Sequence, residues 1–177
     1  LKDKRKHLHR VKAGLVMYRH ALVLNGGVLA SAGGGANLAE WSGGTTLTAN
    51  SSIGRIAQGG YNLETDRVLK LTGDLTLNDF TLTKLNRTPL QIANSTTGSN
   101  GNITAYGGNV SLITNTNMNG GGTVRIGTDA TLTLDDSFGA VTLAKTLRLA
   151  GGQLSNVNGS HQISSGLDIS GHGRITS

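Results

Sequence analysis

Apolar and polar residues alternate along this chain in short runs, which glycine and asparagine separate. Side chains on a β-strand point to opposite faces at successive positions, so each run predicts a strand with two inward residues. The inward pairs expected from this pattern are Leu22/Leu24, Leu69/Leu71, Leu75/Leu77, Phe80/Leu82, Val110/Leu112, Val124/Ile126, Leu132/Leu134, Val141/Leu143, Leu147/Leu149 and Leu167/Ile169. Gly-Gly, Asn-Gly and Asn-Asp steps between the runs favour tight turns. The pattern therefore predicts an all-β chain.

Some of these runs repeat one another. LVLNGGVL at residues 22–29 and LRLAGGQL at residues 147–154 share the pattern LxLxGGxL, and DLTLND at residues 74–79 is matched by ATLTLDD at residues 130–136. Units this small cannot bury an apolar face alone, so they stack and share one core. We expect a right-handed parallel β-solenoid (β-helix) of roughly eight or nine short coils of about 20 residues. An antiparallel sandwich or barrel would have similar turns and is the competing fold.

The composition suits a polar-surfaced extracellular wall or fibre. Hydrophobic residues make up 36 % of the 177 residues, which is enough for a core, but only 15 % are charged. Soluble domains typically have about 25 % charged residues, and here Thr, Ser and Asn take the surface positions instead. The chain has no cysteine, so stacking rather than disulfides must stabilise it. We expect an extracellular or cell-surface location, with exposed corner loops at the polar runs 94–102 and 115–122.

The positive charge lies in one short segment. Residues 1–12 contain six Lys and Arg residues and one Asp, whereas residues 13–177 contain ten Lys and Arg residues and nine acidic residues. The body therefore lacks the basic stripe that a phosphate backbone needs, and we expect no nucleic-acid partner. No apolar run is long enough to predict a membrane span. We interpret residues 1–12 as a basic N-terminal tail and residues 13–177 as one solenoid domain, itself suited to a longer repeat protein.

Three segments follow the first LxLxGGxL run in a fixed order. They are Trp41-Ser42-Gly43, Leu47-Thr48-Ala49-Asn50 and Leu82-Thr83-Lys84. In this order they resemble the autotransporter-associated β-strand repeats of large exported bacterial proteins, over most of residues 21–177. Arg-Thr-Pro-Leu at residues 87–90 departs from that family's glycine-rich step. The resemblance implies a right-handed parallel β-helix that extends from a cell surface as a stalk, adhesin passenger or fibre subunit, and it brings no catalytic residues.

The ionisable residues form no catalytic or metal-binding motif. Enzymes that cleave polysaccharides on β-helices need several acidic groups together with an Arg or Lys on one face. The acidic residues here are scattered, and the adjacent Asp135 and Asp136 would point to opposite sides of a strand. No calcium-binding repeat is present, and the histidines lack a spaced second ligand. We expect no enzymatic activity, no metal and no cofactor, and a polysaccharide lyase or hydrolase is the least favoured function.

The C-terminal run leads to a functional hypothesis. GLDISGHGRITS at residues 166–177 keeps the alternation without a polar cap, and an open solenoid end must be capped, covered or paired. We expect a structural subunit or segment of an extracellular filament that assembles by stacking solenoid ends of identical copies. The residues assigned to assembly are Lys2, Lys4, Arg5, Lys6, Arg10, Lys12, Leu167, Ile169 and Ile175.

The alternative hypothesis is a carbohydrate-binding adhesin or a phage-type receptor fibre. Its contacts would come from Trp41, Tyr61, Tyr106 and polar loops, because aromatic rings with a polar group suit partly wet surfaces. Its partner would be a cell-surface polysaccharide. A lone tryptophan beside a glycine turn more often packs a corner than it contacts a ligand, so Trp41 has two interpretations.

Overall fold

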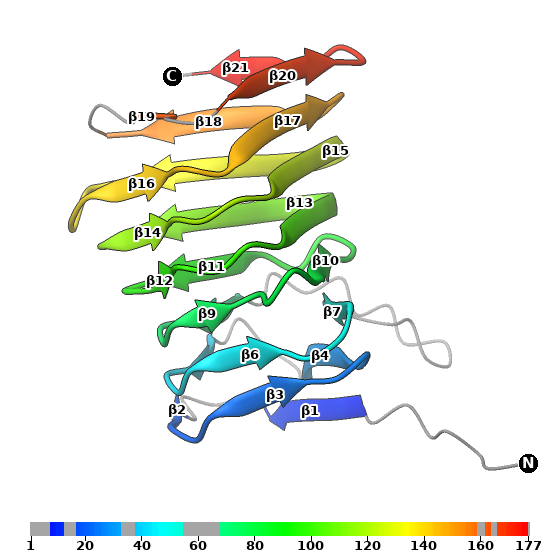
Figure 1. The fold of residues 1–177 in the computed structure, drawn as a ribbon, viewed down its shortest axis with the longest axis vertical. Coiled ribbons are helices and arrows are strands. Elements are labelled where there is room, and N and C mark those ends of the chain that lie inside the picture. Colours follow the sequence, from blue (N-terminus) through cyan, green and yellow to red (C-terminus); the bar gives the residue numbers. More distant parts are fainter. Residues whose placement is uncertain are drawn as a thin grey trace, which may run out of the picture.

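The chain winds as a three-faced parallel β-solenoid. The computed structural model describes residues 8–12, 17–32, 38–54, 68–158, 162–163 and 166–176, and every regular element in these ranges is a β-strand. Neighbouring named strands pair in parallel, and the coils stack from the N-terminal end to the C-terminal end (Figure 1). The expected all-β solenoid is therefore confirmed, and the antiparallel sandwich or barrel is excluded.

Each coil adds one strand, or half of a long strand, to each face. The first face contains β1 (Leu8–Lys12), β4 (Val28–Ala32), β7 (Ser51–Ile53), β10 (Thr81–Lys84), the first halves of β13 (Asn102–Ile113) and β15 (Thr123–Asp135), β17 (Thr146–Ala150) and β20 (Leu167–Ser170). The second face contains β2 (Met17–Tyr18), β5 (Ala39–Trp41), β8 (Leu69–Leu71), β11 (Leu90–Ala93), the second halves of β13 and β15, β18 (Gln153–Val157) and β21 (Arg174–Thr176). The third face contains β3 (Leu22–Leu24), β6 (Thr45–Leu47), β9 (Leu75–Thr76), β12 (Thr96–Thr97), β14 (Thr116–Met118), β16 (Val141–Leu143) and β19 (Gln162–Ile163).

Paired residues of successive coils are about 20 to 25 positions apart in most of the solenoid, and about 30 apart where β5, β6 and β7 pair with β8, β9 and β10. Ile103 pairs with Leu82 in the preceding coil and with Val124 in the next, and Leu147 pairs with Leu167. Within the described ranges the third face has seven strands, while the other faces each have eight strand segments. The described chain therefore makes about seven turns, slightly fewer than the eight or nine coils expected.

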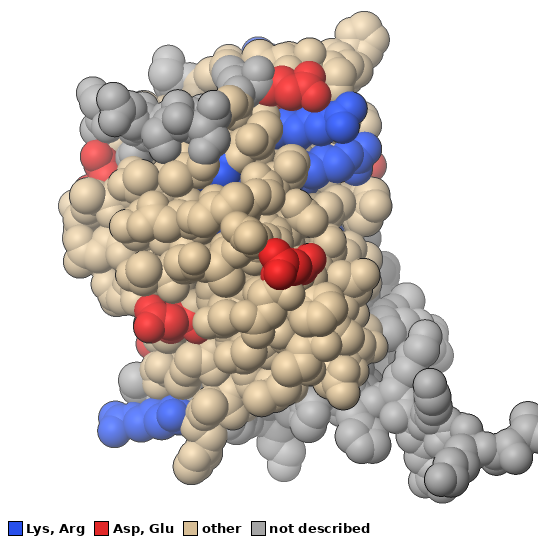
Figure 2. Space-filling view, in the orientation of Figure 1, with Lys and Arg blue, Asp and Glu red and all other residues tan. Residues whose placement is uncertain are grey.

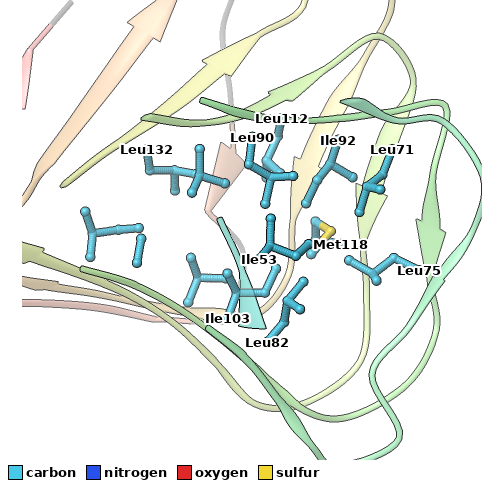
Figure 3. Close-up of a cluster of buried hydrophobic side chains, with 14 of the residues drawn as sticks. Ile53, Leu71, Leu75, Leu82, Leu90, Ile92, Ile103, Leu112, Met118 and Leu132 are labelled. Carbon is cyan, nitrogen blue, oxygen red and sulfur yellow. The ribbon is translucent and has the colours of Figure 1, made fainter. Parts of the chain in front are cut away.

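The inward residues of the three faces form one continuous core. Leu82 from the first face, Leu90 from the second and Leu75 from the third are fully buried and point toward one another (Figure 3). Of the expected inward pairs, all members whose side chains the structure describes are buried except Phe80, which is partly buried, and Ile169, which is 49 % exposed; the side chain of Leu167 lies outside the described residues. Phe80 lies in the turn before β10, and Ile169 lies in the last coil. Burial of aliphatic side chains at each level is the main source of stability.

The two copies of LxLxGGxL occupy different places in the solenoid. In the first copy β3 lies on the third face, and the glycine corner leads to β4 on the first face. In the second copy β17 lies on the first face, and the corner leads to β18 on the second face. The motif therefore specifies a strand, a corner and a second strand, but it does not specify which corner of the coil is formed.

The basic N-terminal segment is not entirely a tail. Residues 8–12 form β1, which pairs in parallel with β4 over its whole length. Five residues of the segment expected to be a tail therefore add one strand to the first face of the solenoid. Residues 1–7 lie outside the described residues.

Two polar runs expected to be exposed loops instead contain strands of the third face. β12 buries Thr97, and β14 buries Thr116 and Met118. The Thr97 hydroxyl contacts the Met118 sulfur at 3.4 Å, and the Thr116 hydroxyl donates to the Ile92 carbonyl oxygen at 2.9 Å. Inward hydroxyl groups can be buried here because they find partners in neighbouring coils.

Asparagine side chains tie successive coils together near the corners. The Oδ1 atom of Asn102 accepts a hydrogen bond from the Thr123 backbone nitrogen at 2.9 Å, one coil later. Asn50 accepts in the same way from Thr81 at 2.8 Å. These bonds satisfy backbone groups where the ladder is interrupted, so the corners are held as firmly as the strands.

Gly108 lies at a coil corner where a substitution tests how closely two coils approach. Its φ is +69°, and a Cβ atom would lie 2.7 Å from the Arg87 carbonyl oxygen of the preceding coil. Gly108→Ala should lower the free energy of unfolding by about 2 kcal/mol or more, through the left-handed backbone and this clash. Chemical denaturation followed by circular dichroism would measure the loss.

Gly98→Ala is the matched control for that substitution. No atom lies within 4 Å of the position that its Cβ would take. Its effect should stay within about 0.5 kcal/mol. Equal effects of the two substitutions would contradict the close approach of coils at Gly108.

Candidate functional site

The last coil exposes apolar side chains that occupy core positions. Ile169 in β20 pairs with the fully buried Leu149, and Ile175 in β21 pairs with the buried Leu154. Yet Ile169 is 49 % exposed and Ile175 is 52 % exposed. They continue two inward columns, and they are exposed because no described coil lies above them (Figure 1).

The backbone of the same coil is open along one edge. Among the described strands β20 pairs only with β17, and β21 pairs only with β18. Unpaired N–H and C=O groups on an exposed edge are a template for another parallel strand. Apolar side chains and an open edge thus coincide on one surface, which we call the terminal surface and define as β20 and β21 with Ile169 and Ile175.

The other residues assigned to assembly are only partly described. Arg10 and Lys12 belong to β1, and Leu167 belongs to β20, where its backbone pairs with Leu147. Lys2, Lys4, Arg5 and Lys6 lie outside the described residues. A contact between these basic residues and a neighbouring copy stays a prediction.

The aromatic residues proposed as ligand contacts have different environments. Trp41 packs against the core at the end of β5, and its Nε1 donates to the His20 carbonyl oxygen at 2.9 Å. Trp41 therefore packs a coil corner, as the first of its two interpretations predicts. Tyr106 lies in β13 and is 57 % exposed, with the Arg125 guanidinium 5.9 Å from its ring centroid. Tyr61 lies outside the described residues.

The described acidic residues serve turns and surface pairs. Asp135 accepts a hydrogen bond from the Ser137 backbone nitrogen at 3.0 Å, and Asp74 accepts one from Thr96 at 3.1 Å. Glu40 lies 4.0 Å from the Lys70 ammonium. Within the described ranges no three His, Cys, Asp or Glu residues are grouped so that they could hold a metal ion. The described part of the chain also contains no apolar helix of membrane-spanning length.

Sequence reasoning did not identify two buried lysines at coil corners. Lys84 and Lys145 are both fully buried. The Lys84 ammonium donates to three backbone carbonyl oxygens, which belong to Leu85, Asn86 and Gly107 at 3.0, 2.6 and 2.8 Å. The Lys145 ammonium donates to the carbonyl oxygens of Ser99 and Gly121 at 3.0 and 2.6 Å.

These lysines cross-link neighbouring coils through their hydrogen bonds. Lys84 follows the buried Leu82 at strand spacing, so it takes an inward position, and that spacing was the available signal. Its chain fills the core, and its ammonium reaches a carbonyl of the next coil at Gly107. Burial lowers the pKa of the Lys84 ammonium to about 8 and also lowers the pKa of Lys145.

Comparisons with known proteins give no assignment. No protein-family model matches the chain, and neither the curated proteins nor the solved structures contain a significant match.

Lys84→Met should reveal the buried ammonium through the pH dependence of stability. Between pH 8 and the ordinary lysine pKa of 10.5, the folded state has released this proton while the unfolded state still holds it. Stability of the wild-type protein relative to Lys84→Met should therefore increase as pH rises from about 8 to about 10, and it should be flat below pH 8. Urea denaturation of both proteins at several pH values measures this difference.

At pH 7 the same substitution leaves three carbonyl groups without their donor. We expect a loss of about 1 to 3 kcal/mol. Lys70→Met removes a lysine from the outer surface, where its pairing with Glu40 is worth about 0 to 1 kcal/mol, and it serves as the control. A stability difference between wild type and Lys84→Met that does not change with pH would contradict the buried charge.

Proposed function

We propose that this protein is a structural β-solenoid of an extracellular surface filament, in which copies stack end to end. The observation that carries the proposal is the terminal surface, where Ile169 and Ile175 continue the core columns into solvent. Covering two half-exposed isoleucines and a row of unpaired backbone groups is favourable for association.

A second copy of the chain is the occupant that fits this surface. The partner must present parallel strands that lie on two faces at the same spacing. The first coil of another copy offers β1 and β2, which belong to the same two faces as β20 and β21. Contact between opposite ends is heterologous and does not close, so repeated addition gives a filament rather than a ring.

The side wall of the solenoid favours axial over lateral assembly. The outward column of the third face starts at Val23 and continues with short polar side chains: Thr46, Thr76, Thr96, Asn117 and Thr142. Figure 2 shows mainly uncharged residues over the strands of this face, while basic side chains group over β15 and β17. Val23 and Phe138, two large exposed hydrophobic residues of the wall, lie on different coils. Among the described residues the third face therefore offers no continuous apolar column for lateral packing.

The proposal predicts that charge at the terminal surface prevents assembly. The variant with both Ile169→Asp and Ile175→Asp would bury two unpaired carboxylates at each junction, which is strongly unfavourable. We expect filaments of uniform width for the wild-type protein in negative-stain electron microscopy, and at least a tenfold smaller sedimenting fraction for the double variant. Circular dichroism should show that the variant remains folded, because both residues are already half exposed.

Phe138→Asp provides the matched control. It replaces an 81 % exposed hydrophobic residue on a middle coil with the same charged residue. Filaments should persist in this variant. Filaments that survive the double substitution, or a wild-type protein that stays monomeric at high concentration, would overturn the proposal.

A further inference from the structure

A second surface lies on the outer side of the first face near its C-terminal end. Thr104, Arg125, Arg148 and Asp168 are paired in that order on successive coils. In Figure 2 basic side chains lie one above another over β15 and β17, with acidic atoms directly above them over β20. We call Tyr106, Arg125, Arg148 and Asp168 the Arg–Tyr surface.

The two arginines of this surface are held differently. The Arg125 guanidinium lies over the Tyr106 ring, 5.9 Å from its centroid. The Arg148 Nε atom lies 3.1 Å from the Asp168 Oδ2 atom, and both side chains are about half exposed. An ion pair this exposed contributes little to stability, so an incoming anion can replace Asp168 at little cost.

The surface has more positive than negative charge. Arg125 and Arg148 face each other on adjacent coils, and like charges directly opposite each other are unfavourable. One carboxylate, Asp168, lies in the same column. In the preceding coils this column has the uncharged residues Ser52, Thr83 and Thr104. An anionic group placed between the two guanidinium groups would relieve their repulsion and form charge-assisted hydrogen bonds.

Neutral groups flank the arginines on both sides. Thr123 and Thr146 form the neighbouring outward column and offer hydroxyl groups. On the other side Gly127 pairs with Ala150, and Gly127 lies beside the Tyr106 ring, where a Cβ would be 4.0 Å from its Cδ1 atom. The half-exposed ring thus lies on one side of the two arginines and the two hydroxyl groups lie on the other, along the same strands.

We infer that the Arg–Tyr surface binds an acidic polysaccharide whose sugars carry carboxylate or sulfate groups. A sugar ring packs on Tyr106, its anionic group lies between Arg125 and Arg148, and its hydroxyl groups bond to Thr123 and Thr146. The chain of sugars crosses successive coils along the solenoid axis. This inference goes beyond the proposed filament and does not depend on it.

The chemistry of the surface favours this ligand over other polyanions. Two arginines are too few for the long row of phosphate contacts that gives nucleic acids their affinity. The strands that carry the arginines, β15 and β17, are paired on both sides, so neither gives an acidic peptide a strand edge to pair with. Hydroxyl groups and an aromatic ring beside the cations are the features that a sugar uses.

Isothermal titration calorimetry with the full chain tests the inference, at a protein concentration below that of filament formation. The probes are oligogalacturonate for carboxylates, sulfated dextran for sulfates, neutral dextran, and polyglutamate as an anion without sugars. Binding to one or both acidic saccharides, with at least tenfold weaker binding to neutral dextran and polyglutamate, is expected. Which acidic saccharide binds more tightly identifies the anionic group.

Substitutions then locate the site. Arg125→Gln and Arg148→Gln should each weaken binding about tenfold, because each removes a charged hydrogen-bond donor. Tyr106→Leu should weaken it several-fold, whereas Asp168→Asn should strengthen it several-fold by removing the competing carboxylate.

Two controls separate this site from nonspecific attraction. Arg19→Gln removes one exposed charge from the opposite end of the solenoid, and the pair Lys4→Gln and Lys6→Gln removes two charges from the basic segment. Neither should change affinity more than twofold. Absence of acidic-saccharide binding, equal binding to polyglutamate, or equal losses in the controls and in Arg125→Gln would overturn the inference.

Discussion

The structure depends on one constraint, which is that each inward side chain lies over its counterpart in the next coil, about 20 to 30 residues later. A single coil cannot bury its apolar residues, so Leu147 and Leu149 are buried only because coils lie on both sides of them. Ile169 occupies the same column one coil later and is half exposed. The same register that stabilises the interior thus leaves half-exposed apolar side chains on the terminal surface. The proposed filament would extend this register from one copy to the next.

Polar groups follow the same constraint at the corners. Lys84 and Lys145 place ammonium groups against backbone carbonyl oxygens of neighbouring coils, and Asn102 accepts from the backbone of the next coil. Without these partners a turning backbone would bury unsatisfied groups. A buried ammonium group is tolerated at Lys84 because one side chain donates hydrogen bonds to three carbonyl groups at once. Corners such as those at Lys84, Lys145 and Asn102 are therefore positions where side chains join neighbouring coils.

The surface proposed for assembly and the surface proposed for polysaccharide binding lie at different places on the solenoid. The terminal surface is apolar and lies at the end of the rod, whereas the Arg–Tyr surface is cationic and lies on its wall. Stacking would leave Tyr106, Arg125 and Arg148 accessible, because they lie on outward positions of coils below the junction. A filament would then repeat the polysaccharide site once per copy, and repeated weak contacts with one long ligand would raise the overall affinity without new contacts.

The sequence by itself determined the all-β solenoid class and most of the inward aliphatic positions, because alternation and glycine corners are local signals that survive in any coil. Tertiary structure alone decided the rest. It placed two identical LxLxGGxL motifs at different corners, turned the polar β12 and β14 into core-facing strands, and brought Tyr106 to Arg125. These outcomes depend on the summed length of the strands and corners in each coil, because this length sets which residues pair between coils. No local sequence pattern encodes that sum.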